Sequence, residues 1–116
     1  MAPTSTPQAV VHDWWLEEDD HGVTALRDNG PVAHAEVQED DASVRLAFWL
    51  EERLPRELRS QLTRTVFDHP ALRPHRPVSV ALPHGESDVL LEVRSHVDDV
   101  RTRVAGSTCL LEGRVH

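Results

Sequence analysis

The sequence contains no lysine and no tyrosine, and all 12 of its basic residues are arginines. Without lysine, the chain has no amine to form a Schiff base and no P-loop lysine to anchor phosphate. Without tyrosine, it has no phenol to serve as a general acid. Arginine in place of lysine, with abundant alanine, valine and proline, is typical of proteins from GC-rich bacterial genomes. These absences remove several catalytic groups before any motif is considered.

Cysteine and long apolar runs are also scarce. The single Cys109 excludes an internal disulfide framework and a cysteine-rich metal cluster. The longest apolar stretch is far below the ~20 residues that a membrane-spanning helix needs. Residues 1–7 have neither the basic start nor the apolar segment of a secretory signal. We therefore expect a cytoplasmic protein that does not enter a membrane.

The eight histidines predict no metal site. None forms a His-x-x-x-His pair with a nearby acid, the spacing that is typical of helical zinc sites. His69 and His75 share a proline-rich loop, which is the closest approach to a ligand pair. In the run His84-Gly85-Glu86-Ser87, the serine is explained as a helix N-cap, and the nucleophile-elbow pattern Gly-x-Ser-x-Gly is absent.

Charge is distributed unevenly along a chain whose formal net charge is −8. Residues 1–52 hold 12 acidic and 2 basic side chains, whereas residues 53–116 hold 8 acidic and 10 basic. Because phosphate repels an acidic protein, we expect no nucleic-acid partner. Six arginines cluster after residue 52, either as a solvated helix face or as a surface for a phosphorylated ligand or an acidic partner. They are Arg53, Arg56, Arg59, Arg64, Arg73 and Arg76.

The first half of the chain has the period of a β-sheet. With 116 residues, 39% of them apolar, the chain predicts one domain over residues 10–116 after a flexible N-terminus at 1–9. Residues 10–16 predict a first strand, in which Trp14 and Trp15 face opposite sides, followed by an acidic turn at 17–22. Alternating apolar residues then predict strands at 23–27, 31–38 and 42–50, with the first two joined at Asn29-Gly30. This is an antiparallel meander.

The second half mixes helical and strand periods. Leucine or valine at every fourth position predicts a helix over 54–67, ended by His69-Pro70. Residues 78–82 and 108–115 predict strands, with Cys109 as a small buried hydrophobe. Apolar residues over 89–104 share one helical face, although a strand over 89–96 is the alternative because so many are β-branched. The expected fold is α+β, a mixed sheet with the meander followed by β-α-β-α-β.

This element order resembles the core of the GNAT-type N-acetyltransferases, the acyl-CoA N-acyltransferase fold, over residues 23–115. The resemblance implies that acetyl-CoA enters between the strands flanking the first helix. Residues 45–50 would pair through their backbone with pantetheine, residues 54–67 would form the pyrophosphate helix, and 78–82 the strand opposite. The implied cofactor-binding residues are Phe48, Leu50, Arg53 and Arg56.

The residues that would complete this resemblance are missing. The family's pyrophosphate loop is Arg/Gln-x-x-Gly-x-Gly/Ala, in which glycines let backbone N–H groups approach phosphate. Here residues 51–56 read Glu-Glu-Arg-Leu-Pro-Arg, with no glycine. The family's usual tyrosine is absent, and its two early helices have no room before residue 23. The resemblance therefore implies a short, degenerate member.

Two main functional hypotheses follow. The first is a vestigial, non-catalytic GNAT-like domain that needs no cofactor and binds a partner protein or itself. A homodimer fits this hypothesis, because the acidic first half of one copy complements the arginines of another. The alternative is an active acyltransferase that binds acetyl-CoA or another acyl-CoA without the glycine loop. A third possibility is a small-ligand-binding domain of another mixed fold.

Overall fold

The computed structural model describes residues 13–116. The flexible N-terminus expected at 1–9, and the start of the strand expected at 10–16, lie outside the described residues. No helix of the described part is both long and apolar enough to cross a membrane.

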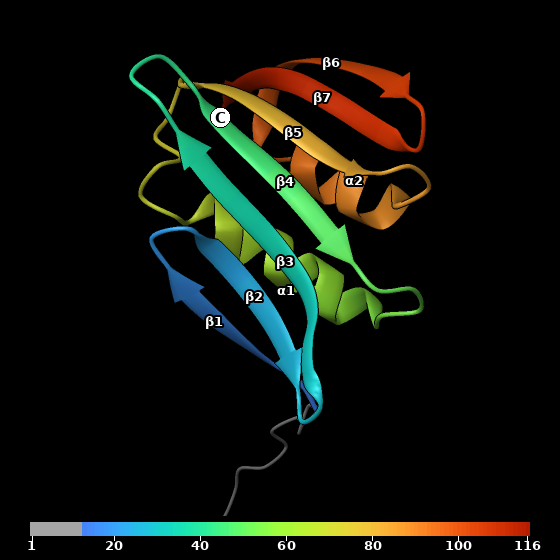
Figure 1. The fold of residues 1–116 in the computed structure, drawn as a ribbon. Coiled ribbons are helices and arrows are strands. Elements are labelled where there is room, and N and C mark those ends of the chain that lie inside the picture. The colour runs from blue at the N-terminus through green and yellow to red at the C-terminus, as the bar shows by residue number, and fades with distance from the viewer. Residues whose placement is uncertain (1–12) are drawn as a thin grey trace, which may run out of the picture.

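Seven strands form one mixed sheet in the order β1-β2-β3-β4-β5-β7-β6 (Figure 1). The pairing of β4 with β5 is parallel, and every other pair is antiparallel. The expected α+β class, with a mixed sheet that begins as a meander, is confirmed. The elements are β1 Trp15–Asp19, β2 Gly22–Arg27, β3 Gly30–Glu39, β4 Val44–Leu50, α1 Arg56–Phe67, β5 Pro77–Pro83, α2 Ser87–Arg94, β6 Val97–Ala105 and β7 Thr108–Val115.

The meander forms where strict alternation and turn chemistry agree. Strand β4 alternates completely between buried and exposed residues, and Asn29-Gly30 joins β2 to β3 as expected. The first strand differs from expectation, because Glu17, Glu18 and Asp19 belong to β1 and not to a turn. At the edge of the sheet, β1 needs only one buried side, so acidic residues fit its solvent side and its ends.

Both helices cover the same face of the sheet (Figure 1). Helix α1 buries Leu58, Leu62 and Val66 against this face, and α2 buries Val89 and Val93. The leucines recur every fourth residue, so one stripe of α1 meets the sheet along its length. Within residues 13–116, no helix lies on the other face, because α1 and α2 are the two helices of this part of the chain.

The expected second helix over 89–104 is wrong in its second half, and the alternative strand over 89–96 is wrong too. Helix α2 ends at Arg94, and residues 97–105 form β6, which pairs with β7. A β-bulge between Asp98 and Arg101 inserts one extra residue, with Asp99 at φ 56°. A bulge reverses the alternation of a strand, so Val97 and Val104 share a face despite their odd spacing. The helix-like spacing of these valines therefore comes from a bulged strand.

Candidate functional site

The carboxyl ends of β4 and β5 separate from one another. Their parallel pairing runs from Val44–Val78 to Ala47–Ala81, but β4 continues to Leu50 and β5 to Pro83. Figure 1 shows the two ends apart, above the start of α1. In sheets with helical crossovers, ligands bind outside the carboxyl ends of the strands. This divergence is therefore the first place to look for a ligand.

The four residues expected to bind a cofactor do not form one open site. The side chains of Phe48 and Leu50 face the helices and are buried, so only their backbone is available at the divergence. Arg53 lies exposed in the connection from β4 to α1, with φ 62°. Arg56 is the first residue of α1, and its guanidinium donates a hydrogen bond to Asp88.

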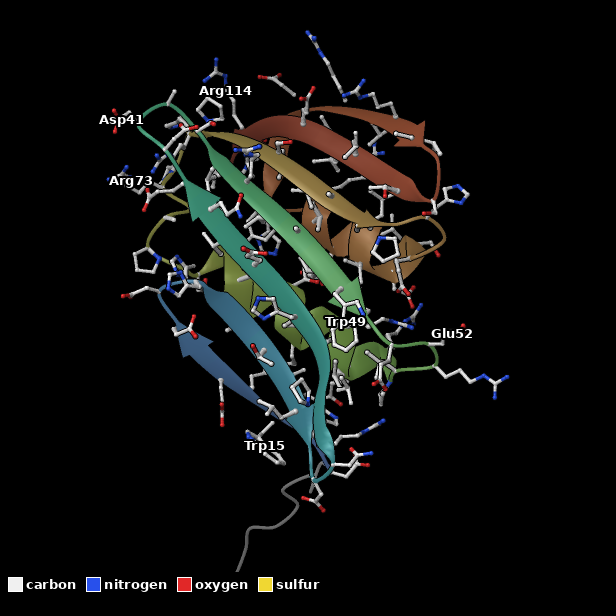
Figure 2. The ribbon with its side chains drawn as sticks, in the orientation of Figure 1. Trp15, Asp41, Trp49, Glu52, Arg73 and Arg114 are labelled. Carbon is white, nitrogen blue, oxygen red and sulfur yellow. The ribbon has the colours of Figure 1, made fainter. Side chains whose placement is uncertain are left out.

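The N-terminus of α1 offers a poor cradle for phosphate. Pro55 is its N-cap residue, without a side-chain cap hydrogen bond, and proline supplies no backbone N–H. Glu51 and Glu52 precede it and are exposed, so their carboxylates repel an anion approaching the helix. Figure 2 shows Glu52 projecting from this connection. The dipole of the helix favours anions at this end, but the neighbouring side chains oppose them.

The arginines of α1 are bound to carboxylates of α2. Arg59 donates from Nη2 to Oδ2 of Asp88 at 2.8 Å, and Arg56 donates from Nη2 to Oδ1 at 3.3 Å. Glu86 Oε1 lies 4.0 Å from Nη1 of Arg59. The hydrogen bond from Arg56 lowers the pKa of Asp88 below its ordinary value of 3.8. Desolvation of the carboxylate opposes this shift, whereas the charge of Arg56 and the hydrogen bond and charge of Arg59 add to it. We call Arg56, Arg59 and Asp88 the helix clasp.

A second set of polar contacts extends the clasp along the helices. Ser60 donates to Glu92 Oε1 at 3.0 Å, and Arg64 lies 3.8 Å from Oε2 of the same carboxylate. His96 contacts Oε2 at 3.2 Å and stacks on Phe67, with ring centroids 4.6 Å apart. The polar side of α1 is thus used to hold α2 in place.

The two remaining arginines of the cluster bind the turn between β3 and β4. Arg76 is hydrogen-bonded to Glu39 and to the carbonyl of Asp40, and Arg73 lies 3.9 Å from Glu39. Backbone N–H groups of Ala42 and Ser43 donate to Asp40 and lower the pKa of its carboxyl. Five of the six clustered arginines therefore face carboxylates of their own chain, and within residues 13–116 Arg53 is the exception.

The run from His84 to Ser87 lines a cavity of about 400 Å³ between α2 and the β6–β7 hairpin. Ser87 is the first residue of α2, and the N-cap is Glu86, without a side-chain cap hydrogen bond. The expected N-cap role of Ser87 is therefore wrong, because the helix begins one residue earlier than the cap pattern requires. Within residues 13–116, no hydrogen bond joins Ser87 to His84. Cys109, buried at the base of this cavity, is the small hydrophobe that was expected.

The described part of the chain contains no cluster of metal ligands. Over residues 13–116, no three histidine, cysteine, aspartate or glutamate side chains gather closely enough to hold an ion. His69 binds the carbonyl of Asp19 through Nε2 at 3.2 Å.

The mixed sheet, the order of its strands, the divergence of β4 from β5 and the two helices on one face define a GNAT-like acyltransferase fold. No family model matches the sequence, and no curated protein matches it. A candidate acetyltransferase from Sphaerobacter thermophilus DSM 20745 matches with a TM-score of 0.52 and 17% identity, covering 90% of this chain and 70% of that one. A GNAT-family acetyltransferase from Streptococcus pneumoniae matches with a TM-score of 0.53 and 12% identity, covering 84% of this chain and 69% of that one. The likeness is one of fold.

Sequence reasoning missed the surface on the other side of the sheet. Trp49 projects from β4 on the side away from the helices and is 49% exposed (Figure 2). The available signal was the alternation of β4, which places Trp49 on the face opposite Phe48 and Leu50. Knowing that this face has no helix required the tertiary structure.

Proposed function

We propose that this chain is a vestigial GNAT-like domain that acts in the bacterial cytoplasm as a non-catalytic protein-binding or dimerisation module. The observation that carries the proposal is the N-terminus of α1, where a phosphate-binding loop would be needed. Pro55 removes a backbone donor there, Glu51 and Glu52 add negative charge, and Arg56 is engaged by Asp88. An acyl-CoA enzyme of this fold needs that region to hold two phosphates.

The test is thermal unfolding with and without acetyl-CoA. A ligand that binds only the native state, at 100 times its dissociation constant, adds roughly 2.7 kcal/mol of stability. For a domain of this size the unfolding midpoint then rises by several degrees. We expect no rise at millimolar acetyl-CoA. A clear rise that is lost in Arg53→Ala/Arg56→Ala, but kept in the exposed control Arg94→Ala, would overturn the proposal.

A second candidate function has one observation in its favour. Beyond Ala47 and Ala81 the end of β4 is not paired with β5, so its backbone can pair with an extended ligand on that side. An acyl-CoA-dependent N-acyltransferase without the glycine loop would use that backbone to hold the pantetheine arm. Release of free CoA thiol from acetyl-CoA, in the presence of a panel of amines, distinguishes this candidate. Release at the no-enzyme rate rejects it for those amines.

A further inference from the structure

The face of the sheet turned away from α1 and α2, which we call the open face, carries a large exposed aromatic side chain. Trp49 on β4 is 49% exposed, and Trp15 on β1, also on this face, is 43% exposed. The residues that directly precede them in the chain, Phe48 and Trp14, are both buried. Tryptophan is enriched in the well-packed centres of protein interfaces, where its burial contributes a large share of binding energy.

A hollow lies on the open face beside Trp49. Its volume is about 330 Å³. Its floor is formed by Ala47 of β4 and Ala81 of β5, and polar or charged side chains complete the lining together with Leu46 and Leu110: Glu36, Gln38, Arg45 and Ser79. Trp49 is two residues beyond Ala47 on the same strand, which is roughly 7 Å at the rise of a β-strand. The two alanines at the centre of the sheet thus leave a recess a short way along the strand from a large projecting side chain. Small side chains at the centre of a face let a second sheet approach to packing distance.

Charges on the open face separate along the order of the strands. Glu17 of β1 and Glu36 of β3 are exposed on one half of the sheet. Arg101 and Arg103 of β6 are exposed at the opposite edge, where Glu112 of β7 lies across from Arg101 on the same face. Arg45 of β4 adds a positive charge near the centre of the face. Unlike the α1 arginines, neither Arg101 nor Arg103 forms an ion pair within residues 13–116. The two arginines therefore outnumber the one carboxylate at this edge, which leaves it with a net positive charge for a partner.

We propose that the open face binds the open face of a second copy of this chain. A two-fold axis running along the strands, between β4 and β5, places β3 and β2 of each copy over β7 and β6 of the other, with β1 beside the outer edge of β6. Because this rotation keeps each residue at its height along the strands, the two Trp49 side chains lie next to one another across the axis. The acidic half of each copy then lies over the basic half of the other. Face-to-face sheets pack about 10 Å apart, within reach of these side chains. This inference rests on the proposed function, because it names the partner of a non-catalytic module.

The experiment is sedimentation equilibrium of the full chain at low salt, over a range of concentrations. We expect a dimer whose dissociation constant rises at least tenfold in Trp49→Ala. The control Leu91→Ala removes a side chain that is 67% exposed on α2, away from the open face, and we expect the dimer unchanged. Circular dichroism of each variant establishes that it is folded.

A charge exchange tests the orientation of the two copies. Glu17→Arg/Glu36→Arg makes the open face basic, and Arg101→Glu/Arg103→Glu makes it acidic. We expect each variant alone to be monomeric, because like charges meet across the axis. An equimolar mixture should form heterodimers, a recovery that misfolded variants would not show.

The inference fails if the wild-type chain stays monomeric at several hundred micromolar, or if a dimer survives Trp49→Ala and both charge reversals. A monomer that shows no stabilisation by acetyl-CoA overturns only the second copy as the partner and leaves the non-catalytic module intact. Conversely, the chain could be stabilised by acetyl-CoA and still form a dimer that depends on Trp49. That result overturns the proposed non-catalytic function but supports the interface on the open face.

Discussion

Arg59 of α1 donates a 2.8 Å hydrogen bond to Asp88 at the start of α2, joining two helices that pack side by side on one face of the sheet. The guanidinium of Arg59 and the carboxylate of Asp88 are both largely shielded, with side-chain exposures of 20% and 30%. A partly shielded, charge-assisted hydrogen bond is stronger than a fully exposed ion pair. The helix clasp therefore engages two arginines that, from the sequence alone, could equally have bound a ligand.

The clasp predicts an acid-sensitive contribution to stability. The folded-state pKa of Asp88 lies below its ordinary value of 3.8. The contribution of the ionised carboxylate to the stability of the fold is therefore present above pH 3.8 and is lost as pH falls through the folded-state pKa. We expect Asp88→Asn to lower the unfolding midpoint at pH 7 and to reduce its further fall towards pH 2. Calorimetry at both pH values measures this. Glu52→Gln, an exposed matched control, should follow the wild type; an Asp88→Asn profile parallel to the wild type would contradict the prediction.

His116 should titrate above its ordinary range. A hydrogen bond to Asp98, Nδ1 to Oδ1 at 3.0 Å, and the charge of that carboxylate raise the pKa of His116 above 6.5. The stabilisation is therefore fully present below pH 6.5 and is lost as pH rises through the folded value. An NMR titration of the imidazole protons measures the pKa. We expect Asp98→Asn to return it towards 6.5, and an unchanged value in the variant would reject the pairing.

Gly22 should tolerate no side chain. A Cβ at this position would lie 2.0 Å from the carbonyl oxygen of Ala35 on β3, and its φ is +142°. We expect Gly22→Ala to cost about 3 kcal/mol or more, since both the strand pairing and the backbone must distort. Gly106→Asn is the control, because its φ of +64° suits asparagine and nothing lies within 4 Å. Equal denaturation midpoints for the two variants would contradict this prediction.

Two leucines in the helices should respond very differently to truncation. Leu62 of α1 is fully buried, whereas Leu91 of α2 is 67% exposed. We expect Leu62→Ala to cost about 2–5 kcal/mol through lost burial and the cavity left behind. Leu91→Ala should stay within about 0.5 kcal/mol of the wild type. Urea unfolding measures both, and a small effect at Leu62 would show that α1 does not pack as described.

The site could be anticipated only in part. Glu51, Glu52 and Pro55 lie close together in the sequence, and their opposition to phosphate follows from chemistry that needs no tertiary contact. The partners of Arg56 and Arg59 could not be foreseen, because Asp88 lies about thirty residues away and reaches them only when α2 packs against α1. Sequence shows which charges exist, while packing decides which of them meet.

The sequence by itself determined the meander from β2 to β4 and helix α1. Strict alternation, the Asn29-Gly30 turn and leucines at every fourth position each allow one regular structure, because local backbone preference and burial agree there. Residues 95–105 carry no such agreement. Their valines fit one helical face, and only the pairing of β6 with β7, with its bulge at Asp99, makes them a strand. Tertiary structure decides such a segment because the hydrogen bonds and burial that distinguish its two forms come from distant residues.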